Sequence, residues 1–209
     1  MSRWPIAAAG LLLLAVACKK AEQPQQAAAP AGPAPGTPEW KIQNAMSAAP
    51  AAIASGATIL DWPASDTAHP AQLRAGTNGW TCFPDMPNTP ANDPMCLDQQ
   101  WMNWAQAWMT HKQPNVTAIG YSYMLMGSAD ADMSDPFKTR PDSGKSWVIE
   151  GPHVMIVVPR SMMAMVNSLP DTQNGGAYVM WKGTPYAHVM LPVGGGGQAP
   201  GGTGEMKGM

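Results

Sequence analysis

The chain has 209 residues, including 21 Gly and 22 Pro, and a formal net charge of −2 at neutral pH. Charged residues make up only 12% of it, about half of the ~25% that is usual for soluble proteins. The near-neutral charge does not indicate the basic surface that a nucleic-acid-binding protein carries. The longest apolar run is shorter than the ~20 residues of a membrane-spanning helix. Length and composition therefore predict one globular domain with unstructured ends and exclude a multi-pass membrane protein.

The first 18 residues have the pattern of an export signal. A single positive residue precedes a short apolar stretch built on Leu11–Leu14, and small residues precede Cys18. The segment Ala15-Val16-Ala17-Cys18 resembles the lipobox of bacterial lipoproteins, although Ala15 stands where that box usually has Leu. The resemblance implies that residues 1–17 are a signal peptide and that Cys18 is lipidated, so that acyl chains anchor the protein in a membrane. An ordinary signal peptide with a Cys near its cleavage site is the alternative.

The composition beyond Cys18 predicts how the rest of the chain is organised. Lys19 follows the cysteine where lipoproteins retained in the inner membrane often carry Asp. By resemblance to that sorting rule, we expect the protein on the periplasm-facing side of the outer membrane. Residues 18–38 are rich in Ala, Pro and Gln and predict a tether, and residues 194–209 predict a Gly-rich disordered tail. The single globular domain then spans residues 39–193.

Helical and strand patterns follow one another irregularly within that domain. Helices are predicted at 41–55 with a break at Pro50, at about 93–112 with Asp93 as N-cap, and at 160–168. Strands are predicted at 57–62, 72–76, 80–83, 116–126, 154–158, 178–182 and 186–193, with hairpins around Asn78-Gly79 and Gly183-Thr184-Pro185. This order predicts an α+β domain, in which a mostly antiparallel sheet is covered on one face by helices.

The main predicted helix carries an aromatic stripe. Trp101, Trp104 and Trp108 fall on one helical face. Such a stripe can line a ligand pocket, but we favour the interpretation that it is the buried face that packs on the sheet.

Two cysteines remain once Cys18 is assigned to lipid. In an oxidising periplasm, Cys82 and Cys96 predict a disulfide that ties the first hairpin to the main helix. A redox or metal-binding thiol pair is the alternative. Because the spacing is not Cys-x-x-Cys, we favour the structural bridge.

A run of oxygen-bearing side chains, Asp130, Asp132, Ser134 and Asp135, has the alternation that suits a calcium loop. Counted from Asp130, however, the sixth and twelfth positions are Asp135 and Pro141, where an EF-hand requires Gly and Glu. We therefore predict a capped, solvent-exposed turn.

A His-Val-Met segment occurs twice, at residues 153–155 and 188–190. Residues two apart in a strand share a face, so each segment presents one imidazole and one thioether together. If the two strands are near neighbours, His153, Met155, His188 and Met190 form a two-nitrogen, two-sulfur set that suits copper. The interpretation favoured by sequence alone is that Met fills the core and both His are hydrogen-bonded within the sheet.

Further along the same region, Met165 lies between the two His-Val-Met segments. The pattern resembles the spaced His, Met and terminal His-x-Met of small periplasmic copper chaperones. Here 11 residues separate His153 from Met165 and 22 separate Met165 from His188, and each gap is about one residue longer than in that family. Three blocks, at 76–82, 93–96 and 183–188, also resemble a group of exported bacterial proteins that has no established activity.

Three functional hypotheses follow. The first is a lipid-anchored exported binding or accessory protein with no evident catalysis, whose small ligand or protein partner is unassigned. The second is a periplasmic copper-binding protein that uses the two His-Val-Met strands. The third is a hydrolase-like enzyme with His153 or His188 as base and Glu150 or an unassigned Asp as orienter, although no positioned nucleophile accompanies them in the sequence.

Overall fold

A computed structural model describes residues 32–65 and 68–194 of the chain, which fall within one compact unit that begins at Gly32. The expected signal peptide, the lipidated Cys18, most of the tether and nearly all of the tail lie outside these described residues. Within residues 32–65 and 68–194, no helix combines the length and the apolar character needed to cross a bilayer.

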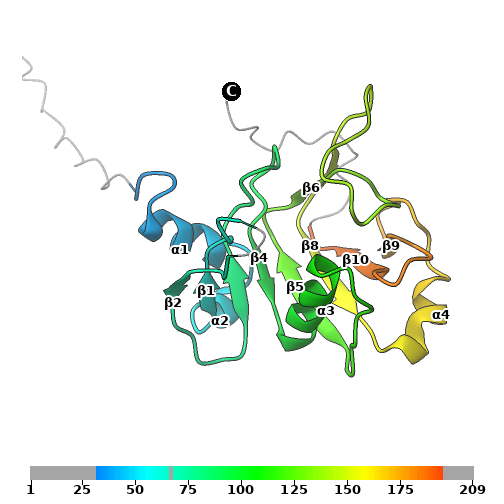
Figure 1. Ribbon diagram of the computed structural model, residues 1–209, viewed down its shortest axis with the longest axis horizontal. Helices are drawn as coiled ribbons and strands as arrows, with labels where there is room; N and C mark the ends of the chain where they lie inside the picture. Colours follow the sequence, from blue (N-terminus) through cyan, green and yellow to red (C-terminus); the bar gives the residue numbers. More distant parts are fainter. Residues whose placement is uncertain (1–31, 66–67, 195–209) are drawn as a thin grey trace, which may run out of the picture. The chain divides into compact units, whose positions relative to one another are not determined.

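The strands of the described chain form a large sheet and a small one (Figure 1). The large sheet contains, in spatial order, β2 (Gln72–Arg74), β1 (Thr58–Leu60), β3 (Thr81–Phe83), β4 (Met95–Leu97), β5 (Gly120–Met124), β8 (His153–Val157), β10 (His188–Pro192) and β9 (Tyr178–Met180). The small sheet pairs β6 (Ser128–Asp130) with β7 (Val148–Glu150). Every neighbouring pair is antiparallel except β1 and β3. The predicted α+β fold with a mostly antiparallel sheet is confirmed.

The helices are short and few. They are α1 (Pro38–Met46), α2 (Ala51–Ala54), α3 (Gln99–Met109) and α4 (Met163–Val166), with the 3-10 turn η1 (Arg160–Met162) leading into α4. The hydroxyl of Thr37 caps α1 by accepting the Trp40 backbone N–H, and Pro38 occupies the first helical turn, where its missing N–H costs nothing. The predicted break at Pro50 separates α1 from α2.

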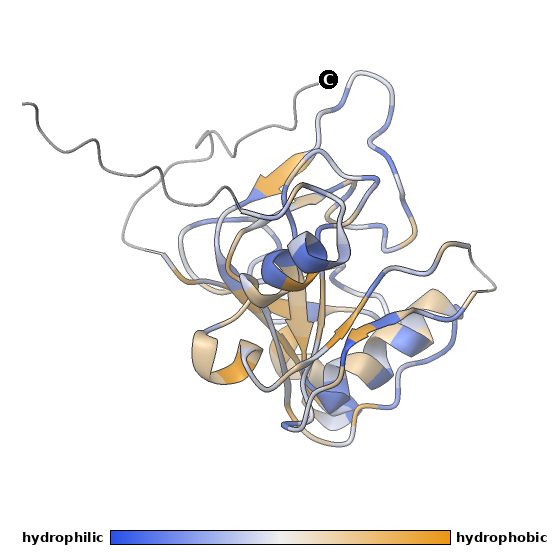
Figure 2. Ribbon diagram, turned by 90° about the vertical axis from the view of Figure 1, so that its left-hand side faces the viewer, coloured by the Kyte–Doolittle hydropathy of each residue, from blue (hydrophilic) through white to orange (hydrophobic). Residues whose placement is uncertain are grey.

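Helices cover both faces of the large sheet, so the prediction of a single covered face is wrong. On one face, α3 packs Trp101 and Trp104 into a cluster that also contains Phe83. On the other face, alanines of α1 and α2 pack around Cys82 and Cys96. Successive residues of β3 are buried on opposite faces, and a strand buried on both faces needs a cover on each side. Figure 2 shows hydrophobic residues concentrated on the strands and hydrophilic residues on the loops around them.

The main helix begins later than predicted. Met95–Leu97 form β4, and the carboxylate of Asp98 caps α3 by accepting the Trp101 backbone N–H at 2.9 Å. Asp93, the predicted N-cap, is buried in the preceding loop, where it accepts hydrogen bonds from the Met86 backbone and the Thr89 hydroxyl. An Asp followed by Pro suits a tight loop as well as a helix start, and here tertiary contacts decided between them.

The two predicted hairpins had different outcomes. β9 and β10 pair as expected around residues 183–185. The hairpin around Asn78-Gly79 does not form, because β1 lies between β2 and β3. The Asn78 side chain instead donates to the Ile53 carbonyl at 2.7 Å and accepts the Trp80 N–H at 3.1 Å. With Gly79 in the left-handed region (φ 78°), this turn joins β2 to β3, and its Asn78 side chain holds it against α2.

Candidate metal site on the buried face of the sheet

The two His-Val-Met segments lie on neighbouring strands and share one face. β8 pairs with β10, and Met155 lies directly opposite Met190. His153 and His188 belong to the same face, because each is two residues from one of these methionines. All four residues are at most 7% exposed. The structure therefore brings the four predicted residues together on one buried face.

The four residues do not form a square, because the two histidines lie at opposite ends of the β8–β10 ladder. His153 lies opposite Pro192, at one end of the ladder, and His188 lies beyond Met190 at the other end. The Met155–Met190 pair therefore separates the two histidines. This defines two corners of the face, one at His153 and one at His188.

Two further methionines complete these corners, and sequence reasoning missed both. Met124 of β5 lies directly opposite His153, and Met180 of β9 lies directly opposite His188. Directly opposite residues of an antiparallel pair have Cβ atoms about 4.5–5.5 Å apart. Both methionines are buried in the same cluster as Met155 and Met190. Each histidine thus has a thioether across the ladder and a second one two residues away on its own strand.

Both imidazoles have one nitrogen without a hydrogen-bond partner among the described residues. His153 Nδ1 lies 2.7 Å from the Gly151 carbonyl oxygen, and His188 Nδ1 lies 3.0 Å from the Tyr186 carbonyl oxygen. A carbonyl can only accept, so each Nδ1 carries a hydrogen, and in a neutral imidazole the Nε2 then presents a lone pair. Neither Nε2 has a hydrogen-bond partner among the described residues, although both atoms are buried.

A third buried atom without a partner lies on the same face. The hydroxyl of Ser122 is fully buried and has no hydrogen-bond partner in the described part of the chain. Ser122 lies directly opposite Met155, so all three such atoms border the Met155–Met190 pair. Because buried polar atoms are normally paired, three unpaired ones on a single face call for an explanation.

The His188 imidazole is neutral at neutral pH. Burial lowers the pKa of His188 to about 4, and the nearby His153 lowers it further, against the opposing effect of the hydrogen bond to the Tyr186 carbonyl. A neutral imidazole has the free lone pair that a metal ion requires. Within the described ranges, no three His, Cys, Asp or Glu side chains gather closely enough to hold a metal ion. A metal bound at these histidines would therefore need thioether ligands.

Three tryptophans surround His188. The ring centroids of Trp101, Trp104 and Trp181 lie 5.1–5.3 Å from that of His188, at interplanar angles of 76–80°. Trp104 also stacks with Trp108 and with Trp181. The stripe on α3 is thus largely buried against the sheet as predicted, and it also encloses one histidine of the candidate site.

Trp181 reaches this enclosure through an unusual backbone conformation. Its φ is 55°, in the left-handed region, which costs a non-glycine residue roughly 1–2 kcal/mol. Two hydrogen bonds hold it there: its backbone N–H donates to the Met133 carbonyl at 2.9 Å and its indole N–H donates to the Asp132 carbonyl at 3.0 Å. These bonds and the stacking on Trp104 and Trp108 hold the indole beside His188.

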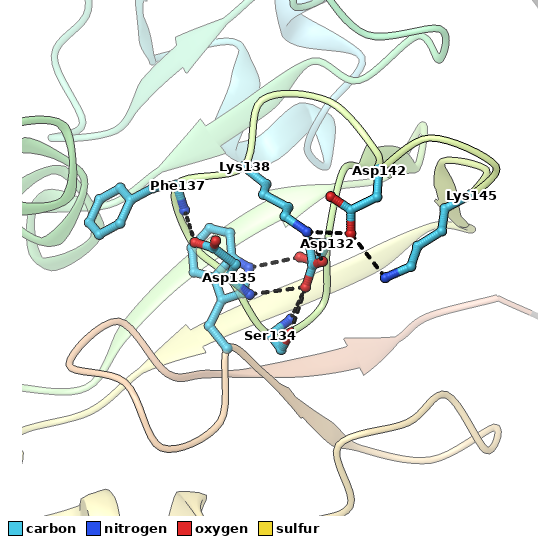
Figure 3. A network of polar contacts seen from close by, with 8 residues as sticks. Asp132, Ser134, Asp135, Phe137, Lys138, Asp142 and Lys145 are labelled. Atoms are coloured by element: carbon cyan, nitrogen blue, oxygen red, sulfur yellow. Dashed lines mark hydrogen bonds and ion pairs between the residues drawn. The ribbon is translucent and has the colours of Figure 1, made fainter.

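The segment that holds Trp181 is the acidic loop considered for calcium (Figure 3). Asp132 accepts hydrogen bonds from the Ser134 hydroxyl and from the backbone N–H groups of Ser134 and Asp135, and Lys138 bridges it to Asp142. These bonds, led by that from the Ser134 hydroxyl, hold the pKa of Asp132 well below its usual range. The carboxylate oxygens of Asp132 therefore accept hydrogen bonds from groups of the loop itself, in accord with the predicted capped turn.

His153 has a different environment, dominated by Glu150. The closest approach of the two is 4.0 Å, from His153 Nε2 to Glu150 Oε2. The carboxylate of Glu150 accepts hydrogen bonds from Ser128, Gln173 and Tyr178. Glu150 thus lies within ion-pair distance of His153, while its hydrogen bonds go to Ser128, Gln173 and Tyr178.

The network around Glu150 extends to Asp130 of β6. The Ser128 hydroxyl lies 3.0 Å from Asp130 and 3.3 Å from Glu150. Burial, and then the charge of Glu150, raises the pKa of Asp130 to about 7. Burial, and then the same charge, raises the pKa of Tyr178 well above its usual range. The His153 corner is therefore acidic, in contrast to the aromatic corner at His188.

The disulfide lies on the opposite side of the sheet from the histidines. Cys82 and Cys96 are directly opposite each other on β3 and β4 and form a disulfide, with both residues fully buried. Cys96 belongs to β4 rather than to the first turn of the main helix, so the bridge joins two strands.

A groove with a volume of about 300 Å³ opens beside the His188 corner. Its lining includes Trp104, Val157 and Ala187, which adjoin His188, and the exposed Arg160 at η1. The groove lies beside the His188 corner, and His188 itself is buried.

No known protein family, curated protein or solved structure matches this chain.

Proposed function

We propose that the protein is a lipid-anchored, non-catalytic binding protein of the cell envelope that takes a copper(I) ion on the buried face formed by His153, Met155, His188 and Met190. The supporting observation is the pair of buried imidazole Nε2 atoms that lack a hydrogen-bond partner among the described residues, on a face of thioethers. An unsatisfied buried polar group costs about 1–3 kcal/mol. A cation bound at one of these lone pairs would remove that cost at that histidine.

The ligand types favour copper(I) over other cations. Thioether sulfur is soft and selects copper(I), and imidazole suits copper as well, whereas calcium and magnesium require oxygen ligands. No cluster of His, Cys, Asp and Glu able to hold a metal exists in the described residues, which argues against a zinc site of the usual composition. A monovalent ion also suits a buried face whose donors are neutral, because its desolvation is less costly than that of a divalent ion.

The anchor and the location rest on the sequence. Ala15-Val16-Ala17-Cys18 supports lipidation of Cys18, and Lys19 supports the periplasm-facing side of the outer membrane. The direct test is the intact mass of the protein purified from membranes. A mass increase that matches acyl chains, lost in Cys18→Ser, is expected, and an unmodified Cys18 would refute the anchor without touching the metal site.

The metal site is tested by anaerobic titration of the full chain with copper(I) against a chromophoric copper(I) chelator. We expect the wild type to bind copper(I) and His153→Ala/His188→Ala to bind it at least about 100-fold more weakly. Removing a ligand lowers metal affinity at least as much as removing a residue that only supports a ligand. The matched control changes the two exposed histidines, His69→Ala and His111→Asn, with Asn chosen because His111 has a φ of 54°.

A second variant guards against misfolding of the first. Met155→Leu/Met190→Leu conserves volume and removes both sulfurs, so near-UV circular dichroism should remain as in the wild type while copper(I) affinity falls. Wild-type affinity in either double variant, or a wild type that takes up no copper(I), would overturn the proposal.

A further inference from the structure

We infer that the copper(I) ion occupies the His188 corner, with His188, Met180 and Met190 as ligands and the tryptophan enclosure against it. This inference rests on the proposed function and assigns the ion to one of the two corners. Met180 is added as a ligand, and the indoles become part of the site. Met155 and His153 are then no longer primary ligands.

The donor set at this corner converges from two strands. Met180 lies directly opposite His188 on β9, and Met190 lies two residues from His188 on the same face of β10. All three residues are at most 2% exposed. His188 Nε2 is buried and has no partner in the described part of the chain. One nitrogen and two sulfurs from adjacent positions form a three-ligand set for a soft monovalent ion.

The enclosure adds a cation-stabilising surface. Trp101, Trp104 and Trp181 all lie 5.1–5.3 Å from the His188 ring. The face of an indole attracts a cation within about 6 Å, and the attraction is stronger where water is excluded. The left-handed backbone of Trp181 supports this role, because residues held in rare conformations concentrate at functional sites.

The His153 corner lacks these features. Its Nε2 lies 4.0 Å from a Glu150 oxygen, and a carboxylate oxygen is a hard ligand that suits hard cations better than a soft ion. None of the described aromatic ring contacts involves His153, whereas three involve His188 with tryptophan. The groove of about 300 Å³ also opens beside Trp104, next to His188. The softer corner, with no carboxylate contact to its histidine among the described residues, is therefore the one at His188.

The test uses a matched pair of methionines. Met180 faces His188 and Met124 faces His153, and both are buried in the same cluster. Met180→Leu and Met124→Leu conserve volume to the same degree. Copper(I) affinity is measured anaerobically by chelator competition, and tryptophan fluorescence is recorded during the titration. We expect Met180→Leu to weaken binding at least about 10-fold, while Met124→Leu binds within about 2-fold of the wild type.

The fluorescence readout separates a ligand role from a packing role. Copper(I) should quench tryptophan emission in the wild type and in Met124→Leu, and His188→Asn should abolish the quenching whereas His153→Asn should retain it. Weaker binding in Met124→Leu alone, or an equal loss in both variants, would overturn the His188 corner while the proposed function stands. A wild type that takes up no copper(I) would overturn both.

Discussion

The buried carboxylate of Asp93 gives a sharp test of the electrostatics of this fold. Asp93 is 3% exposed and accepts hydrogen bonds from the Met86 backbone at 2.9 Å and the Thr89 hydroxyl at 2.6 Å. Burial raises the pKa of Asp93 from its ordinary value of 3.8 to about 6, because the hydrogen bonds offset only part of the desolvation and the nearby Asp85 adds negative charge. The folded state therefore favours the neutral acid.

The sign and size of the effect follow by linkage. A carboxyl group whose pKa is raised by folding stabilises the protein fully below pH 3.8, and that contribution is lost as the pH rises through about 6. A pKa shift of this size lowers the free energy of unfolding by about 3 kcal/mol at neutral pH, relative to acidic pH. Asp93→Asn removes the ionisation while its amide can still accept from Met86 and donate to Thr89. We therefore expect Asp93→Asn to be more stable than the wild type by about 3 kcal/mol at pH 7, and nearly equal to it at pH 4.

The assay is urea unfolding followed by tryptophan fluorescence from pH 4 to pH 8, with the disulfide intact. At pH 7 the variant should melt roughly 6–12 °C higher in a parallel thermal experiment. Asp171→Asn, which changes an exposed carboxylate, controls for the change in net charge. A difference between Asp93→Asn and the wild type that is independent of pH, or that grows as the pH falls, would refute the reasoning.

Three further predictions concern the frame of the sheet. Cys82→Ala/Cys96→Ala should lower the free energy of unfolding by ~3 kcal/mol, because it opens a loop of 14 residues, and a urea midpoint equal to that of the wild type would contradict this. Asp98→Ala should cost about 1–3 kcal/mol in the same assay, because this side chain accepts backbone N–H groups from both α3 and β5; a loss below about 0.5 kcal/mol would show that water replaces both bonds. Gly76→Ala should destabilise by roughly 3 kcal/mol or more, since its Cβ would lie 2.1 Å from the backbone of β1, whereas Gly151→Ala meets no atom within 4 Å. Equal unfolding midpoints for the two glycine variants would count against the predicted backbone clash.

The sequence carried enough information to predict the fold class and the buried face. The alternation in β8 and β10 directly indicates which residues share a side, and the second hairpin fixes the pairing of β9 with β10. The prediction of His153, Met155, His188 and Met190 on one face needed only that β8 and β10 be neighbours, which they are.

The parts that could not be predicted depend on contacts between segments distant in sequence. Met124 and Met180 join the site only through strand register, and a run of methionines gives no signal that distinguishes a ligand from a core residue. Asp93 is the predicted cap of the main helix, but β4 pairs with β3 and β5, and the helix begins after Asp98 instead. The parallel pairing of β1 with β3 similarly overrides the local turn signal at Asn78.

The ligand set of a copper(I)-loaded protein is the most direct test of the proposed site. X-ray absorption at the copper edge distinguishes sulfur from nitrogen neighbours and detects the outer-shell pattern of an imidazole. The proposal predicts a mixed shell with two sulfurs and one imidazole nitrogen, in which the nitrogen disappears in His188→Asn. A shell of nitrogen and oxygen alone, or the same spectrum in His188→Asn as in the wild type, would contradict it.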